Sequence, residues 1–100
     1  MYNKYVKAVP GTKEFEFYTF LAAYLSQDVK SFKKGVKSYK KDADAYSKTL
    51  LVSAIDEFFE LEYSNEEKAK FVSWLSSGHI GITETNEKLT FVRDLFKDKL

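Results

Sequence analysis

The amino-acid sequence predicts an all-α fold, a compact bundle of about five short helices around a central apolar helix at residues 43–62. The central helix is predicted by Asp42–Tyr63, where apolar residues recur every three or four positions and cover about two-thirds of a helical wheel. Capping and stop signals divide the rest of the chain into further segments of helical length. Because so apolar a helix must be covered on most sides, we expect the other segments to pack around it.

The N-terminal third leaves two alternatives open. Thr12 is a typical helix cap after the Pro-Gly pair, and it predicts a helix over residues 12–27. The alternation in EFEF instead suits a hairpin in which a short strand, Tyr2–Val9, pairs with Glu14–Phe20. The continuation LAAYLSQ favours the helix.

A second helix, Val29–Lys41, is predicted to follow, with Asp28 as its cap. It carries a narrow apolar stripe on one face and lysines on the opposite face. Gly35 lies in its middle, where glycine costs about 1 kcal/mol relative to alanine. We therefore expect Gly35 either to allow a neighbour to approach closely or to mark a bend. The central helix then begins near Asp42 or Asp44.

Two more helices are predicted after the central one. Ser64 and Glu67 fit the capping box S-x-x-E, and the helix they start is expected to end at Gly78. Thr83 or Thr85 is the expected cap of the last helix. We find no internal repeat, linker or low-complexity tract, which predicts one helical domain over residues 1–100.

Composition and motifs argue against enzymatic chemistry. The chain has no cysteine, which excludes disulfides, thiolate metal sites and a cysteine nucleophile. Its one histidine, His79, has no nucleophile-elbow, metal-ligand or phosphate-loop motif around it, and we interpret it as a loop residue. We therefore expect a protein that is not an enzyme, with no catalytic residue, no metal and no cofactor.

The hydropathy pattern predicts no membrane span. No apolar run approaches the roughly 18–20 residues that are needed to cross a bilayer. Glu14 and Glu16 place charge where a signal peptide would be uncharged. A cytoplasmic location is therefore expected.

Charge is distributed unevenly, although the net charge is only +1. The lysine set, all within Val29–Lys41, contains Lys30, Lys33, Lys34, Lys37, Lys40 and Lys41. The acidic set, all within Asp56–Glu67, contains Asp56, Glu57, Glu60, Glu62, Glu66 and Glu67. In one interpretation the two sets lie close together and neutralise each other as surface ion pairs. In another the lysine set follows a phosphate backbone, and in a third the acidic set docks onto a protein.

The third interpretation is the one we favour from the sequence. In this interpretation the protein is a small protein-binding module, such as an adaptor, inhibitor or antagonist. It binds its partner through the acidic set, and Trp74 is a candidate exposed aromatic anchor. The alternative is a sequence-tolerant nucleic-acid-binding protein that uses helix 29–41, since lysines contact phosphate as point charges. The identity of the protein partner and the presence of a homodimer stay open.

Fifteen of the sixteen basic residues are lysine, and the exception is Arg93. In size, lysine bias and lack of chemical motifs the chain is similar in general character to accessory proteins of phages and mobile elements of AT-rich bacteria. Such proteins often act by binding a host protein, so the resemblance implies a binding function. It assigns no role to any residue.

Overall fold

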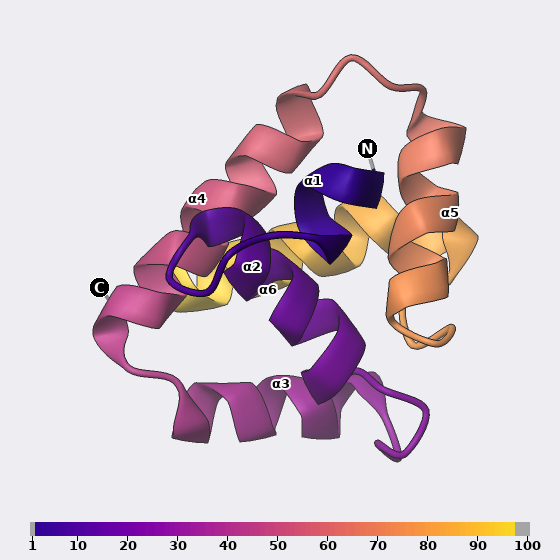
Figure 1. Cartoon of the computed structure of the whole chain (residues 1–100). Coiled ribbons are helices and arrows are strands. Elements are labelled where there is room, and N and C mark those ends of the chain that lie inside the picture. Colours follow the sequence, from indigo (N-terminus) through magenta and orange to yellow (C-terminus); the bar gives the residue numbers. More distant parts are fainter. Residues whose placement is uncertain (1, 98–100) are drawn as a thin grey trace.

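The computed structural model describes residues 2–97, and all regular structure in that range is helical (Figure 1). In chain order the elements are α1 (Tyr2–Val6), α2 (Lys13–Thr19), the π-helical turn η1 (Phe20–Tyr24), α3 (Phe32–Asp42), α4 (Ala45–Glu60), α5 (Asn65–Leu75), the 3-10 turn η2 (Ile82–Glu84) and α6 (Thr85–Lys97). The all-α prediction is confirmed. Within residues 2–97, no helix combines the length and the apolarity that a bilayer span requires.

The central helix of the prediction is α4, which packs against both α2 and α6. Leu51, Ile55 and Phe58 on its inner side are fully buried. Its polar strip, including Ser53, faces solvent as the helical wheel predicts. Tyr46, which the wheel places on the apolar side, is 66% exposed in the first turn of α4.

Three of the predicted helix starts are confirmed by side-chain caps. Thr12 Oγ1 accepts a hydrogen bond from the Phe15 amide at 3.3 Å. Asp44 Oδ1 accepts one from Ser47 at 2.8 Å, and this backbone donor lowers the pKa of Asp44. Ser64 Oγ accepts one from the Glu67 amide at 3.1 Å. Each cap satisfies a backbone N–H that the first helical turn leaves without a partner.

The N-terminal hairpin is wrong, because both of its proposed strands are helical. A helical turn over Tyr2–Val6 directs Tyr2 and Tyr5 to one side, where the Tyr2 ring contacts Phe71 with centroids 4.8 Å apart. In the second segment the buried residues are Phe17, Phe20 and Leu21, which have helical spacing. The period-two pattern in EFEF is local, and core packing at a period of 3.6 residues overrides it.

The second helix begins later than predicted, and Asp28 does not cap it. Asp28 is exposed in the turn after η1, where the Val29 amide donates to the Ser26 carbonyl at 3.0 Å. Ser31 is the cap of α3, since its Oγ accepts from the Lys34 amide at 3.2 Å. The chain uses residues 25–31 to reverse direction and bring α3 back against η1, so Lys30 precedes the helix.

Gly35 allows the close approach that its position predicts. A Cβ at this position would clash with the Tyr24 carbonyl oxygen and lie 2.5 Å from Leu25 Cδ2. The backbone of α3 therefore rests directly on the end of η1. This close contact explains why glycine occupies position 35, so a bend in α3 is not needed to account for it.

The connection from α5 to α6 contains two left-handed residues. Gly78 is left-handed as predicted (φ 83°), and so is Ser77 (φ 52°), while α5 itself ends earlier, at Leu75. Thr83 lies inside η2 and Thr85 is the first residue of α6, so neither residue precedes the helix as a cap. The turn into α6 is instead held by the Glu84 carboxylate, which accepts from the Gly81 amide at 2.9 Å.

Two groups of aromatic rings fill the core. The first joins α1, α2, α4 and α5 and contains Tyr5, Phe17, Phe58 and Phe71, with the Phe17 and Phe58 centroids 5.0 Å apart. The second joins η1, α3 and α6 around Tyr39, whose ring lies 5.2 Å from Phe20 and 5.3 Å from Phe96. Aromatic residues supply large buried areas in a chain of this length.

The hydroxyls of the two buried tyrosines have different partners, and this predicts opposite effects of their removal. Tyr39 Oη donates to Glu16 Oε1 at 2.7 Å, whereas Tyr5 Oη is buried without a hydrogen-bond partner among residues 2–97. Tyr39→Phe should lower the free energy of unfolding by about 1.5–2 kcal/mol, and Tyr5→Phe should raise it by about 1 kcal/mol. Urea unfolding at neutral pH measures both. Effects of the same sign in the two variants would contradict the assignment.

Candidate functional site

The acidic set does not form one continuous face. Asp56 pairs with Arg93 on α6 at 3.3 Å. Its neighbour Glu57 turns to α1 and α2, where Lys4 lies 2.6 Å away and Lys13 forms a second ion pair. The hydrogen bond from Lys13, with that from Lys4, lowers the pKa of Glu57. Successive residues of a helix point in directions about 100° apart, so the two acids face different neighbours.

The rest of the acidic set is spread over three elements. Glu60 ends α4, Glu62 lies in the loop after it, and Glu66 and Glu67 stand in the first turn of α5. Glu66 pairs with Lys70 one turn along, at 3.0 Å. Acidic side chains at the start of a helix interact favourably with the positive end of the helix dipole. Glu66 and Glu67 therefore stabilise α5 without any partner protein.

The lysine set lies on or just before α3, along one edge of the molecule (Figure 1). All six side chains are exposed. Within residues 2–97, none of them forms an ion pair, and the partners of the acidic set are Lys4, Lys13, Lys70 and Arg93. The interpretation in which the two sets neutralise each other is therefore wrong. The cations that balance the acids come from the segments that pack against α4 and α5.

An apolar groove runs beside the lysine set, between α3 and α6. It consists of two adjoining hollows of about 320 Å³ and 290 Å³ that share Lys33 and Phe91. We call it the α3–α6 groove, and its lining residues are Phe32, Lys33, Val36, Lys37, Lys40, Glu87, Lys88, Phe91 and Leu95. Large apolar side chains line this groove, and lysines without an acidic partner within residues 2–97 stand beside them.

The floor and the rim of the groove come from different faces of α3. Val36 is buried and Phe32 is half-buried, and together with Leu95 of α6 they form the apolar floor of the two adjoining hollows. Phe91 projects from α6 with 52% of its surface exposed, and its ring centroid lies 6.2 Å from that of Phe32. Lys33, Lys37 and Lys40 recur at helical spacing along one side.

The opposite rim of the groove is partly neutralised. Lys88 lies with its Nζ 4.8 Å from the Phe32 ring centroid, and this ammonium also pairs with Glu84 at 3.2 Å. Glu87 is the one acid among the lining residues. The three α3 lysines therefore leave the groove with a net positive potential beside an apolar surface.

Trp74 is exposed, as the sequence suggests for an anchor. It is 60% exposed on α5, and its ring centroid lies 5.6 Å from that of Tyr2, which is itself 50% exposed. Its own helix also supplies Phe71, 6.3 Å away. Trp74 therefore packs at the edge of the first aromatic group. It is not among the residues that line the α3–α6 groove.

His79 joins two loops. Its Nε2 lies 3.0 Å from the Ser26 carbonyl oxygen, and its own carbonyl accepts from Lys88 Nζ at 3.1 Å. The half-buried ring therefore ties the α5–α6 connection to the turn that follows η1. His79 lies in a loop as predicted, and its contact with the turn after η1 is a tertiary contact that the sequence does not predict.

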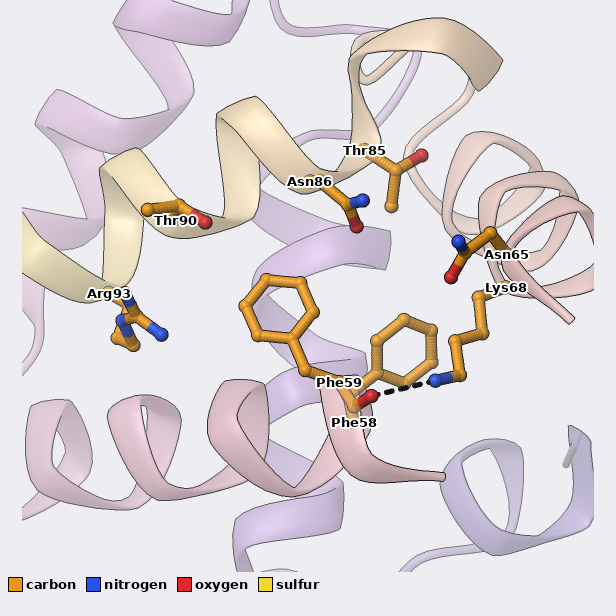
Figure 2. Close-up of a pocket in the computed structure, with 8 residues that line it drawn as sticks. All are labelled: Phe58, Phe59, Asn65, Lys68, Thr85, Asn86, Thr90 and Arg93. Atoms are coloured by element: carbon orange, nitrogen blue, oxygen red, sulfur yellow. Dashed lines mark hydrogen bonds between the residues drawn. The ribbon is translucent and has the colours of Figure 1, made fainter. Parts of the chain in front are cut away.

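A separate polar pocket of about 320 Å³ opens where the end of α4, the start of α5 and α6 meet (Figure 2). Its lining residues are Phe58, Phe59, Asn65, Lys68, Thr85, Asn86, Thr90 and Arg93. Sequence reasoning missed this site, because its polar residues come from segments far apart in the chain. The one feature of the sequence that could have indicated this pocket is Lys68. It is a lysine that directly follows the acidic run, and it lies on the side of α5 that faces the core.

Comparison of the chain with known protein families, with curated protein sequences and with solved structures finds no match in any of the three. The functional argument therefore rests on the contacts, charges and cavities of this chain.

Proposed function

We propose that this protein is a binding module that takes an acidic, amphipathic helix of a partner protein into the α3–α6 groove. The observation that carries the proposal is the juxtaposition of an exposed Phe91 and an apolar floor with three lysines that have no acidic partner within the described residues. Helix-in-groove recognition uses apolar anchors at one-turn spacing, and the charges at the rim select the partner.

Charge complementarity specifies the chemistry of the partner. Lys33, Lys37 and Lys40 stand along one rim, so a bound helix would place Glu or Asp on the side that faces them. Its apolar residues would pack on Phe91 and Leu95. The site is thus the lysine face, and the acidic set, half of which is already ion-paired, is not part of it.

Nucleic-acid binding remains the second candidate, and it has its own observation. All six lysines are exposed and unpaired within residues 2–97, and Phe91 offers a ring on which an unpaired base can stack. The aliphatic floor argues for protein, because a phosphate backbone gains nothing from Val36 or Leu95.

Paired lysine substitutions test the proposal. We expect Lys33→Gln with Lys40→Gln to weaken binding of a designed acidic amphipathic peptide about tenfold, since each exposed charge contributes up to about 1 kcal/mol. The matched control is Lys34→Gln with Lys41→Gln, which makes the same change of charge on α3 outside the groove lining. NMR titration of the labelled protein measures the affinities.

A single-stranded oligonucleotide is the second probe. If the lysine set binds phosphate, both lysine pairs should weaken oligonucleotide binding to the same degree, and binding should fall steeply with salt. Peptide binding that survives the Lys33 and Lys40 changes, or that falls equally in the control, would contradict the groove proposal.

A further inference from the structure

The polar pocket between α4, α5 and α6 contains a buried cation without an anion. Lys68 retains only 7% of its surface exposure, and its Nζ donates to the Phe59 carbonyl at 2.8 Å (Figure 2). Within residues 2–97 no carboxylate pairs with this ammonium. An ammonium has three donors, so two N–H groups remain. Burial of a charge is unfavourable unless a counter-ion or further hydrogen bonds compensate it.

The other cation of the pocket is already balanced. Arg93 pairs with Asp56 at 3.3 Å and with Asp94 at 3.1 Å, and its guanidinium lies 5.8 Å from the Phe59 ring centroid. Arg93 also stands at the far end of the pocket from Lys68 (Figure 2). Of the two cations that line the pocket, Lys68 is therefore the one without a carboxylate partner within residues 2–97.

Neutral hydrogen-bonding side chains supply much of the rest of the pocket lining. The amides of Asn65 and Asn86 lie on the two sides of the opening, above the rings of Phe58 and Phe59 in the view of Figure 2. Neither amide makes a side-chain hydrogen bond within the described part of the chain. Both carry N–H donors, so the lining of the pocket offers amide donors in addition to the ammonium, and carboxylate oxygens accept from both kinds of donor.

We propose that this pocket binds a small organic monocarboxylate, with the carboxylate on Lys68 and the apolar body against the Phe59 ring. One unmatched positive charge matches a carboxylate better than a phosphate, which carries up to two negative charges at neutral pH. The volume of about 320 Å³ lies at the lower end of the range for ligand pockets, which limits the ligand to a small molecule. The site is independent of the α3–α6 groove.

NMR titration of the full chain with benzoate, acetate and inorganic phosphate tests the proposal, with sodium chloride as the ionic-strength control. We expect saturable shifts of the Asn65 and Asn86 side-chain amides with benzoate, which should bind at least about tenfold more tightly than acetate because its ring leaves water. Acetate mimics an acidic side chain of a protein, so this comparison separates a free ligand from a docked residue. Phosphate should bind more weakly than benzoate.

Two variants locate the site. Lys68→Met keeps the apolar stem and removes the ammonium, and it should weaken benzoate binding at least about tenfold. Asn86→Ala removes an exposed amide whose side chain makes no hydrogen bond within the described chain, and it should weaken benzoate binding. This variant tests the site if Lys68→Met fails to fold. Lys70→Gln changes an exposed lysine of the same helix and should bind benzoate as the original protein does. The proposal would be overturned if benzoate caused no saturable shifts, or if phosphate bound more tightly than benzoate. It would also be overturned if the folded Lys68→Met variant or the Asn86→Ala variant bound benzoate as tightly as the original protein.

Discussion

Gly35→Ala is expected to lower the free energy of unfolding by about 1–3 kcal/mol, although alanine is the better helix former by about 1 kcal/mol. The added Cβ would clash with the Tyr24 carbonyl oxygen, which belongs to backbone and cannot move aside as a side chain would. Either α3 or the end of η1 must shift. That shift would disturb the second aromatic group, in which Tyr39 of α3 contacts Phe20 of η1.

Ser38→Ala is the matched control for this prediction. Ser38 lies one turn further along α3 and is exposed, so its replacement reports helix propensity alone and should stabilise by a few tenths of a kcal/mol. Urea unfolding of both variants, with a native-like far-UV spectrum as the check on the fold, gives the comparison. A Gly35→Ala variant as stable as the original protein would show that α3 does not rest on η1.

Alkaline pH should destabilise the protein through its two buried tyrosines. Burial raises the pKa of the Tyr5 hydroxyl, and burial together with the hydrogen bond to Glu16 raises that of Tyr39. Both lie well above the ordinary value of 10.0, at which the unfolded chain loses these protons. Unfolding therefore releases protons above pH 10, so stability is complete below that pH and falls as the pH rises further.

The expected slope is about 1.4 kcal/mol for each pH unit and each tyrosine between the unfolded and the folded pKa. Urea midpoints measured from about pH 8 to about pH 11.5 give this slope. The variant with both Tyr5→Phe and Tyr39→Phe is the control, and its stability should fall less steeply, with lysine titration as the remainder. Equal slopes in the two proteins would mean that the tyrosine hydroxyls ionise as readily folded as unfolded.

Local signals in the sequence were sufficient for most of the helices and for three of their starts, and insufficient for the starts of α3 and α6. The caps Thr12, Asp44 and Ser64 act through hydrogen bonds to amides three residues away, so a short stretch of sequence determines them. Asp28 and Ser31 are both cap-forming residues, and the choice between them depends on where α3 meets η1. That contact is tertiary, and no local pattern reports it.

The helix α1 was missed for a related reason. It has five residues, too few for a stable helix in isolation, and it is held by the insertion of Tyr5 among Phe17, Phe58 and Phe71. Two of those rings lie more than fifty residues away along the chain. A short segment whose conformation depends on such distant packing cannot be assigned from its own sequence.

The candidate binding surfaces show the same limit. The acidic set is continuous in sequence, yet the helical period directs Asp56 and Glu57 to different neighbours. The α3–α6 groove needs Val36 and Phe91, which line one hollow only because the fold brings α3 and α6, far apart in sequence, near each other. Periodicity identified the lysines and the apolar stripe of α3, but it gave no sign that Phe91 and Leu95 of α6 would complete a groove beside them.

Photo-crosslinking from position 91 tests the central claim most directly. A photoreactive phenylalanine analogue replaces Phe91 in one variant and Trp74 in a second, and each is irradiated in lysate with and without prior nuclease treatment. The α3–α6 groove predicts a discrete protein adduct from position 91, linked through an acidic amphipathic helix, absent from position 74 and lost with the Lys33→Gln and Lys40→Gln changes. Adducts only to nucleic acid before nuclease treatment, only to a second copy of this chain, or only from position 74 would contradict the claim.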